Sequence, residues 1–249
     1  MRVIPVIDLK SGLVVRGVAG RREEYRPIVS QLTSEPTPQA VAAAFAQRFG
    51  FRAVYVADLD AIGGQAPDVC AYQQIAAAGL SLWIDAGMAT AETVFPSGTP
   101  TSIIVGLESL TSDQELRQSI ANLGPERIVF SLDLKSGRPI TQIANWRQRS
   151  PHEIAAAAIA GGVCRIIILD LADVGVGRGA GTLDLVRRLR AEHPSLEITA
   201  GGGVRGLADL QEMARAGCDA ALVASALHDG RITPDEVRWL HGNTSTTLL

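Results

Sequence analysis

Cysteine is scarce in this sequence. Only Cys70, Cys164 and Cys218 occur among the 249 residues, and no two of them have CxxC spacing. Three scattered cysteines build neither a disulfide framework nor a cysteine metal site, which excludes the disulfide-rich secreted class and favours a reducing compartment. No group of His, Cys, Asp and Glu has metal-ligand spacing either, so the sequence predicts no metal and no other cofactor.

An excess of charge of one sign and long apolar runs are also missing. The chain has 23 Lys and Arg against 26 Asp and Glu, a net charge of −3. Nucleic-acid binding needs clustered Lys and Arg, so we expect no nucleic-acid partner. No apolar stretch of about 18 residues is free of charge, and Pro5 and Asp8 interrupt the N-terminus too early for a secretory signal. The sequence therefore predicts a cytoplasmic protein without a membrane partner.

Apolar residues are plentiful, at 47%, and occur in short runs separated by helical patterns. The runs are rich in Val and Ile, as in strands buried on both faces. Eight such runs, each followed by a helix, predict an α/β fold, a (βα)8 TIM barrel. An open doubly wound sheet needs a glycine-rich first turn, which residues 8–12 (DLKSG) do not provide. The predicted strands span residues 3–7, 53–57, 80–84, 102–105, 128–132, 165–169, 196–199 and 220–223.

We expect a single barrel domain over residues 1–242 and a flexible, Thr-rich tail over residues 243–249. Two helix starts are marked by a capping hydroxyl, then Pro, then Glu three residues after the cap; the caps are Ser150 and Thr233. Alternating glycines over residues 175–181 do not complete a GxGxxG nucleotide motif, because Ala180 stands at its third glycine position.

The strongest internal signal is a repeat of half the chain. Residues 7–12 (IDLKSG) recur as residues 132–137 (LDLKSG). Three further pairs follow in the same order, which are residues 57–59 with 169–171, 85–89 with 201–205, and 104–106 with 222–224. This pattern predicts two duplicated half-barrels of four strands each. Asp8 and Asp133, at the ends of the first and fifth strands, should then face each other across the barrel mouth.

Five aspartates end or closely follow predicted strands, namely Asp8, Asp58, Asp85, Asp133 and Asp170. In a (βα)8 barrel the catalytic groups stand at this end of the strands. Each carboxylate could instead have a structural role, since a buried carboxylate must be solvated or hydrogen-bonded. Asp8 and Asp133 are the strongest catalytic candidates, because two opposed carboxyls in different surroundings can act as base and acid. Asp58 is a candidate for substrate binding.

Residues 201–205 (GGGVR) follow the seventh strand, and residues 223–226 (VASA) follow the eighth. Successive glycines let backbone N–H groups approach an anion, and phosphate sites of such barrels are commonly built from these two loops. A simple flexible turn is the alternative. We predict a phosphate site formed by Gly202, Gly203, Arg205, Ala224 and Ser225.

The matching loops of the first half carry Asp85 and Glu108. Carboxylates repel phosphate, so this end should bind an uncharged, hydroxylated or cationic group, unless both carboxylates pair with Arg or Lys. Trp146 is either a lid that stacks on the substrate or a hydrophobic plug. Arg16 could steady an anion or pair with a carboxylate, and His228, just past the last strand, is a candidate for acid–base chemistry.

Taken together, these motifs resemble the histidine-biosynthesis barrels, the HisA/HisF family, and are closer to the HisA isomerases. The resemblance covers about residues 1–232 and depends on residues 4–10 (IPVIDLK), 12, 15–16 (VR), 56–60 (VADLD), 131–133 (SLD), 146, 201–205 (GGGVR) and 223–227 (VASAL). It implies an Amadori rearrangement of a phosphorylated aminoaldose, with Asp8 as the general base and Asp133 as the carboxylate opposite it. It also implies a substrate with two phosphates, one per half-barrel.

The sequence departs from the family pattern in three loops. Residues 85–89 (DAGMA) replace a GGGIR-like phosphate loop, and residues 106–109 (GLES) replace a Gly-Thr loop. After the sixth strand, Leu169 stands in place of Thr and Val174 in place of an acidic partner. Asp170 and Asp173 therefore remain as candidate acids in this segment. These departures indicate a divergent HisA-like member with an altered phosphate site in its first half.

Three functions stay open on the sequence. The first is a HisA-like isomerase of histidine biosynthesis that acts on ProFAR. The second is a divergent enzyme with a one-phosphate substrate, for which the biosynthesis of a one-carbon carrier cofactor of the methanopterin or methanofuran type is one setting. The third is a non-catalytic barrel that binds a phosphorylated ligand. All three take a small phosphorylated metabolite as partner, and the sequence leaves the oligomeric state open.

Overall fold

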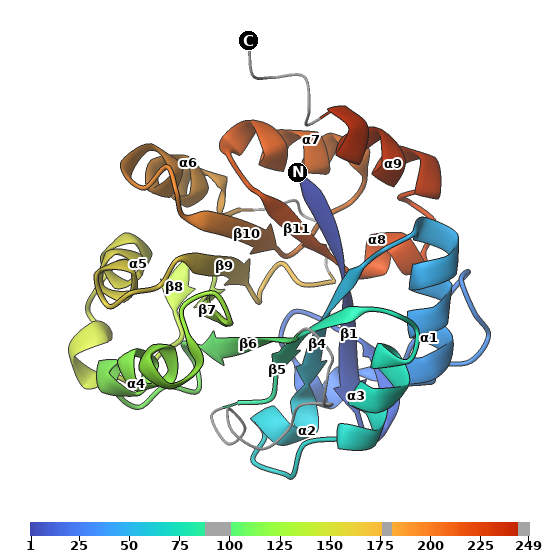
Figure 1. Ribbon diagram of the computed structural model, residues 1–249, viewed down its shortest axis with the longest axis horizontal. Coiled ribbons are helices and arrows are strands. Elements are labelled where there is room, and N and C mark those ends of the chain that lie inside the picture. The colour runs from blue at the N-terminus through green and yellow to red at the C-terminus, as the bar shows by residue number, and fades with distance from the viewer. Residues whose placement is uncertain (88–100, 176–180, 244–249) are drawn as a thin grey trace.

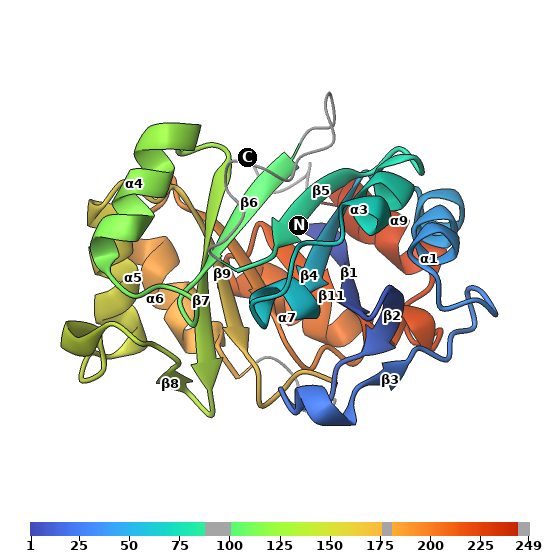
Figure 2. The ribbon, with the colours of Figure 1, turned by 90° about the horizontal axis from the view of Figure 1, so that it is seen from below.

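A computed structural model describes residues 1–87, 101–175 and 181–243 of the chain. Its centre is a ring of parallel strands surrounded by helices (Figures 1 and 2). In order around the ring, the strands are β1 (Arg2–Lys10), β4 (Ala53–Asp58), β5 (Ser81–Asp85), β6 (Thr101–Gly106), β7 (Ile128–Lys135), β9 (Arg165–Asp170), β10 (Glu197–Gly201) and β11 (Ala220–Val223). Parallel pairing of β11 with β1 closes the ring. The predicted (βα)8 barrel is therefore confirmed.

Helices cover the outside of the ring. They are α1 (Pro38–Ala44), α2 (Leu59–Ile62), α3 (Val69–Ala76), α4 (Asp113–Leu123), α5 (Pro151–Ala160), α6 (Leu183–Glu192), α7 (Leu207–Ala216), α8 (Ser225–His228) and α9 (Pro234–Asn243). The capping predictions at Ser150 and Thr233 are confirmed, because each hydroxyl accepts a hydrogen bond from the backbone N–H of the Glu three residues later. No helix of the described segments is long and apolar enough to span a membrane.

Two short hairpins extend strands of the ring at the same end. β2 (Leu13–Arg16) pairs with the end of β1 and also with β3 (Arg26–Pro27), and β8 (Arg138–Pro139) pairs with the end of β7. Both turns contain a Ser–Gly pair at positive φ, with values of 52° and 75° in the first and 52° and 76° in the second. The structure thus gives the repeated IDLKSG motif one conformation in both places. The duplication of the half-barrels itself stays a prediction.

The apolar core has two layers. A small cluster fills the inside of the ring and contains Ile4, Tyr55, Ala57, Trp83, Ile104, Val129, Ile167, Ala220 and Leu222. A larger cluster lies between the ring and the helices. At the amino end of the strands, the Arg165 guanidinium lies 4.6 Å from the centre of the Trp83 ring, which closes this end of the interior. The opposite end is the one that remains open for a site.

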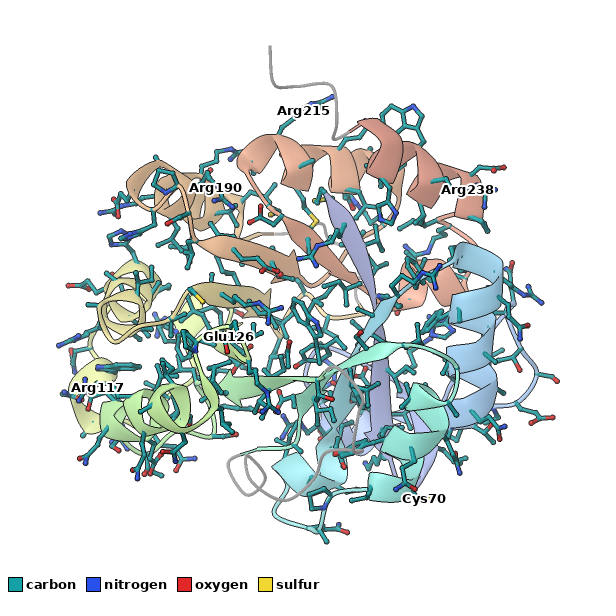
Figure 3. The ribbon with its side chains drawn as sticks, viewed as in Figure 1. Cys70, Arg117, Glu126, Arg190, Arg215 and Arg238 are labelled. Carbon is teal, nitrogen blue, oxygen red and sulfur yellow. The ribbon has the colours of Figure 1, made fainter. Side chains whose placement is uncertain are left out.

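Some predictions concern segments outside the described residues. These segments are the tail from residue 244 on, residues 88–89 of the DAGMA loop, and residues 176–180 of the alternating glycines. Helix α9 extends to Asn243, and the boundary of the predicted tail stays untested. All three cysteines are free thiols; Cys70, at the edge of the molecule in Figure 3, and Cys164 are exposed, whereas Cys218 is buried.

Candidate active site

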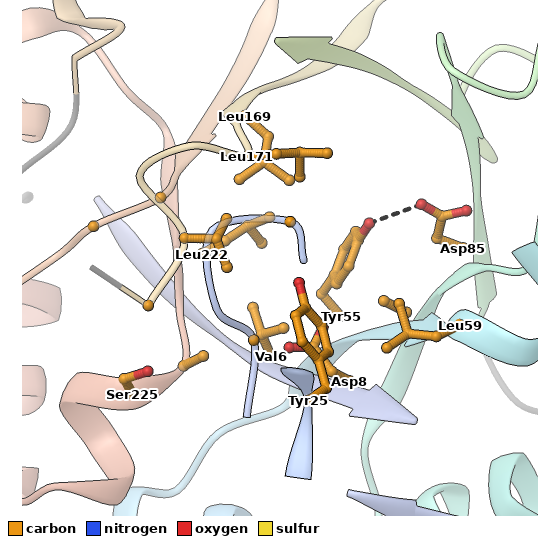
Figure 4. A pocket seen from close by; sticks show the side chains of 18 of the residues that line it. Val6, Asp8, Tyr25, Tyr55, Leu59, Asp85, Leu169, Leu171, Leu222 and Ser225 are labelled. Atoms are coloured by element: carbon orange, nitrogen blue, oxygen red, sulfur yellow. Dashed lines mark hydrogen bonds between the residues drawn. The ribbon is translucent and has the colours of Figure 1, made fainter. Parts of the chain in front are cut away.

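A cavity opens at the carboxyl ends of the strands, between inward-facing side chains and the loops that follow them (Figure 4). It encloses about 990 Å³, including solvent at its mouth. Four acidic side chains line it, those of Asp8, Asp85, Glu108 and Asp133, and the glycine turn at Gly202 and Gly203 forms a further part of its wall. Between them lie apolar side chains, among which are Val6, Leu59, Leu169, Leu171, Val174 and Leu222.

Alternation along the strands explains why three of the five candidate aspartates face this cavity. Side chains at every second position of a strand point to the same face. The interior cluster contains Ile4, Trp83 and Val129. Asp8 lies four residues after Ile4, and Asp133 lies four residues after Val129. Asp85 lies two residues after Trp83, so all three aspartates point to the inside of the ring. Strands β1 and β7 stand four places apart in the ring of eight, so the predicted opposition of Asp8 and Asp133 fits the strand order.

Asp8 lies beneath the loop that follows β2. A Cβ atom at Gly17 would be 3.1 Å from Asp8 Oδ2, so the glycine gives the carboxyl group room beneath this loop. Burial raises the pKa of Asp8 to about 7, and the positive charge of Arg22 opposes part of this rise. A carboxyl group with a pKa near neutrality can both accept and release a proton at physiological pH.

Asp133 has a more acidic neighbourhood and fixed partners. Ser131 Oγ donates a hydrogen bond of 2.6 Å to Asp133 Oδ1, and the backbone N–H of Glu108 lies 3.5 Å from Oδ2. Burial raises the pKa of Asp133 to about 8, and the negative charges of Glu108 and Asp85 add to the rise. Among the carboxyl groups whose pKa is raised in this cavity, Asp133 therefore retains its proton best at neutral pH.

Asp85 and Glu108 have different partners. The Tyr55 hydroxyl donates a 3.0 Å hydrogen bond to Asp85 Oδ2 (Figure 4), and the Gly87 N–H lies 3.3 Å from Oδ1. Burial raises the pKa of Asp85 to about 6 despite these hydrogen bonds. Glu108 forms an ion pair with Arg22, which comes from the loop between β2 and β3. Pairing with a cation, one of the two alternatives considered for these carboxylates, thus holds for Glu108.

The glycine turn forms the side of the cavity predicted to bind phosphate. Gly202 and Gly203 have φ values of 94° and 70°, and a Cβ at Gly202 would be 3.0 Å from the Asp170 carbonyl oxygen, so the turn requires glycine. Ala224 and Ser225 line the same region. Four of the five predicted phosphate-site residues therefore lie together.

Arg205, the fifth, has its side chain elsewhere. Its Nε donates to Asp209 Oδ2 at 3.0 Å and its Nη2 to Oδ1 at 2.6 Å. The guanidinium is therefore engaged in a two-pronged ion pair on helix α7 and is not among the groups that line the cavity. A different arginine, Arg231, lines the cavity near the turn.

Asp58 and Asp170 point away from the cavity, to the helical side of their strands. Asp58 accepts hydrogen bonds from the N–H groups of Ala61 and Asp68 and, at 2.6 Å, from the Tyr72 hydroxyl, so it caps α2 and links it to α3. Asp170 instead binds the N–H groups of Ser136, Gly137 and Ala172 at 2.7–3.0 Å. For these two residues the structure favours the structural alternative.

Three further candidates are also not among the residues that line the cavity. Trp146 is only 2% exposed and packs in the outer core, so it has the position of a plug and not of a lid. Arg16 forms an ion pair with Asp229. Asp173 lies in the turn after β9, where its Cβ is 3.5 Å from the position that a Gly202 side chain would occupy. It neighbours the glycine turn without lining the cavity.

His228 is buried within the protein. Its Nδ1 is 2.9 Å from the Ser30 hydroxyl, and its ring contacts that of Phe45. Burial and the nearby charge of Arg16 lower the pKa of His228 to about 4. The ring is therefore neutral at physiological pH and stands away from the cavity lining, which does not favour a role in acid–base chemistry.

Four polar or charged side chains of the cavity were not expected from the sequence, namely those of Arg22, Tyr25, Tyr55 and Arg231. Tyr55 could have been found, because it stands two residues before the inward-facing Ala57 on the same strand. The others lie on loops, whose course the sequence pattern does not give. Among the described residues, no three His, Cys, Asp or Glu side chains converge as the ligands of a metal ion would.

The closed ring of parallel strands, with its cavity at their carboxyl ends, defines a (βα)8 barrel of the TIM class. Within this class, the chain belongs to the family described as histidine biosynthesis protein, whose model matches residues 2–233. The resemblance drawn from the motifs is therefore confirmed over nearly the whole chain.

The chain is similar in sequence to relatives that bear different names. One is the uncharacterized protein MJ0703 of Methanocaldococcus jannaschii, 30% identical over 95% of this chain and 97% of its own length. Another, from Rubrobacter xylanophilus, is named 1-(5-phosphoribosyl)-5-((5-phosphoribosylamino)methylideneamino) imidazole-4-carboxamide isomerase, and is 31% identical over 94% of both chains. The protein of the same name from Alkaliphilus metalliredigens is 28% identical over 96% of this chain and 98% of its own.

Proposed function

We propose that this protein is an isomerase that converts a phosphorylated aminoaldose to the aminoketose by proton transfer, an Amadori-type rearrangement. One observation carries the proposal: a single cavity joins two buried carboxyl groups of near-neutral pKa, Asp8 and Asp133, to the turn at Gly202 and Gly203. Family membership supports this reaction class, as do relatives that are named isomerases.

In this proposal Asp133 is the acid and Asp8 the base. With a pKa of about 8, Asp133 carries a proton at neutral pH, and it donates this proton to the ring oxygen as the C1–O bond breaks. Asp8, with a pKa of about 7, removes the proton from C2 of the resulting iminium. Protonation at C1 and loss of the C2 hydroxyl proton give the aminoketose, so the reaction needs no external oxidant or reductant.

The substrate in this proposal has one phosphate, which binds at the glycine turn. The opposite wall carries Asp85 and Glu108, and the charge of the nearby Arg22 is balanced by Glu108. A second phosphate there would meet the negative charge of Asp85, which forms no ion pair with a described residue and is ionised at neutral pH with a pKa of about 6. This wall is suited instead to hydroxyl groups or to a cationic group of the substrate.

A second candidate is the isomerase of histidine biosynthesis that acts on ProFAR, a substrate with two phosphates. The relatives that bear this enzyme's name, at 28–31% identity over nearly their whole lengths, favour it. The wall that carries Asp85 and Glu108 counts against this candidate, because the second phosphate of ProFAR would have to bind there.

The test is turnover in deuterium oxide of ProFAR and of an N-substituted 5-phosphoribosylamine, followed by NMR. We expect ketose with deuterium at C1 from the monophosphorylated substrate, and a loss of about 10²- to 10⁴-fold in rate for Asp8→Asn, as for removal of a general base. Asp184→Asn, an exposed carboxyl on α6, is the matched control and should leave the rate unchanged.

The other outcomes separate the alternatives. Turnover of ProFAR alone, with rescue of a histidine auxotroph that lacks this step, would replace the one-phosphate proposal by the second candidate. Binding of both compounds without turnover of either, unchanged in Asp8→Asn, would contradict an enzymatic role altogether.

A further inference from the structure

Arg205 follows the glycine turn, but its side chain does not line the cavity. Its guanidinium is held by both carboxylate oxygens of Asp209, and even its backbone N–H donates to Asp209 Oδ2 at 2.7 Å. The pair is neutral as a whole and fixes the start of α7. A cationic side chain that assists the backbone N–H groups of the turn in holding an anion must therefore be another one than Arg205.

Arg231 meets this need. It lines the cavity, in the loop between α8 and α9. Its Nη1 donates to the Arg205 carbonyl oxygen at 3.0 Å, and its Nη2 to Asp229 Oδ2 at 3.0 Å. The first contact ties the loop after β11 to the loop after β10. A guanidinium has five N–H donors, so donors beyond these two contacts are available to a ligand in the cavity.

The charges around Arg231 do not cancel. Asp229 lies between two arginines, because its carboxylate also forms an ion pair with Arg16. Both guanidinium groups lower the pKa of Asp229, so the carboxylate stays ionised, and the group of two arginines and one aspartate has a net charge of +1. The adjacent His228 is neutral, and the Arg205–Asp209 pair adds no net charge.

We propose that Arg231 is the cationic anchor of a phosphate monoester bound at the glycine turn, and that Arg16 is a positioning residue which shares Asp229 and so keeps the charge of Arg231 available. This inference rests on the proposed function in taking the glycine turn as the phosphate end of the cavity. It assigns to Arg231 the role that the sequence pattern gave to Arg205, and it explains why Arg16 stands behind the site and not in its wall.

The first test is calorimetric titration of the full-length protein with inorganic phosphate at fixed low ionic strength. We expect Arg231→Met to weaken phosphate binding about tenfold or more, as for loss of one charge-assisted hydrogen bond. Arg231→Lys should lose less. Arg205→Met combined with Asp209→Asn, which removes the ion pair without leaving a net charge, is the matched control: it should lower the melting temperature yet leave phosphate affinity within about twofold.

The second test concerns Arg16. Arg16→Met should weaken phosphate binding because Asp229 is then left to neutralise Arg231. Adding Asp229→Asn should restore the affinity, a rescue that a merely structural role of Arg16 would not produce.

The outcomes distinguish this inference from the proposed function. Lost affinity in the Arg205→Met/Asp209→Asn variant with unchanged affinity in Arg231→Met would overturn the anchor while leaving the proposed isomerase intact. A wild-type protein that binds no phosphate would overturn both. Failure of the Asp229→Asn rescue would overturn the role given to Arg16.

Discussion

A single hydroxyl group tunes the proposed acid of this site. Ser131 Oγ donates to Asp133 and favours the carboxylate, against the larger effects of burial and of the charges on Glu108 and Asp85. Removing a hydrogen bond worth about 0.5–1.5 kcal/mol should raise the pKa of Asp133 by roughly half to one unit. We predict that Ser131→Ala moves the alkaline limb of the kcat/KM–pH profile upward and leaves the acid limb in place.

The profile of the wild-type enzyme sets the reference. Because Asp8 must be ionised and Asp133 protonated, activity should be greatest between the two pKa values of about 7 and 8 and fall on both sides. Ser119→Ala, which removes a hydroxyl bonded within α4, is the matched control. An alkaline limb that stays in place or moves downward in Ser131→Ala would show that Asp133 is not the acid.

At the scale of strands, the sequence indicates which face of a strand each aspartate occupies, in addition to where the strands end. The eight runs were sufficient to predict the closed barrel, since each is buried on both faces and each is followed by a helix. Counting in twos along β1 from Ile4 and along β7 from Val129 reaches Asp8 and Asp133. The same count along β4 from Tyr55 and along β9 from Ile167 passes over Asp58 and Asp170, which fall on the helical face. Closeness to a strand end alone could not make this distinction.

Loops limited the rest of the prediction. The Arg22–Glu108 ion pair joins residues 86 positions apart across the mouth, and Arg231 reaches the cavity from beyond the last strand. No local pattern fixes such contacts, because they depend on where two independent loops lie in space. Trp146 shows the same limit: only packing decides whether an aromatic in a loop is a lid or a plug.

Helix α2 offers a test of the role that the structure gives to Asp58. Its carboxylate accepts from two backbone N–H groups and from the buried Tyr72 hydroxyl, so Asp58→Ala leaves these donors unpaired. We predict a loss of about 2–4 kcal/mol in the free energy of unfolding, measured in urea, with KM changed less than about threefold at low temperature. Asp184→Ala, with a fully exposed side chain, should change neither quantity. A large rise in KM with unchanged stability would return Asp58 to the substrate-binding residues.

The buried carboxyl groups of the cavity lower the free energy of unfolding of the whole molecule when they ionise. The pKa values of Asp8, Asp85 and Asp133 are raised to about 7, 6 and 8 from 3.8, and burial is the largest cause each time. A carboxyl group whose pKa is higher in the folded state holds its proton more tightly there. Its contribution to stability is therefore complete below about pH 3.8 and is lost progressively as the pH rises through the raised value. Stability should fall toward alkaline pH for this reason.

Asp133→Asn isolates this cost, because the amide is nearly isosteric and cannot ionise. Below about pH 3.8 the carboxyl is protonated in the folded and the unfolded state alike, and the variant should differ little there. At pH 6 only the unfolded chain is ionised at this position, and by pH 9 the folded wild type also holds a buried charge that the variant lacks. We predict that the free energy of unfolding of the variant, relative to wild type, rises by about 2.7 kcal/mol between pH 6 and pH 9, while activity is lost. Asp184→Asn should show no such trend. A relative stability independent of pH would mean that Asp133 is ionised throughout, and an ionised Asp133 could not supply the proton that opens the sugar ring. The same measurement therefore tests whether this barrel gives up stability to keep an acid in its cavity.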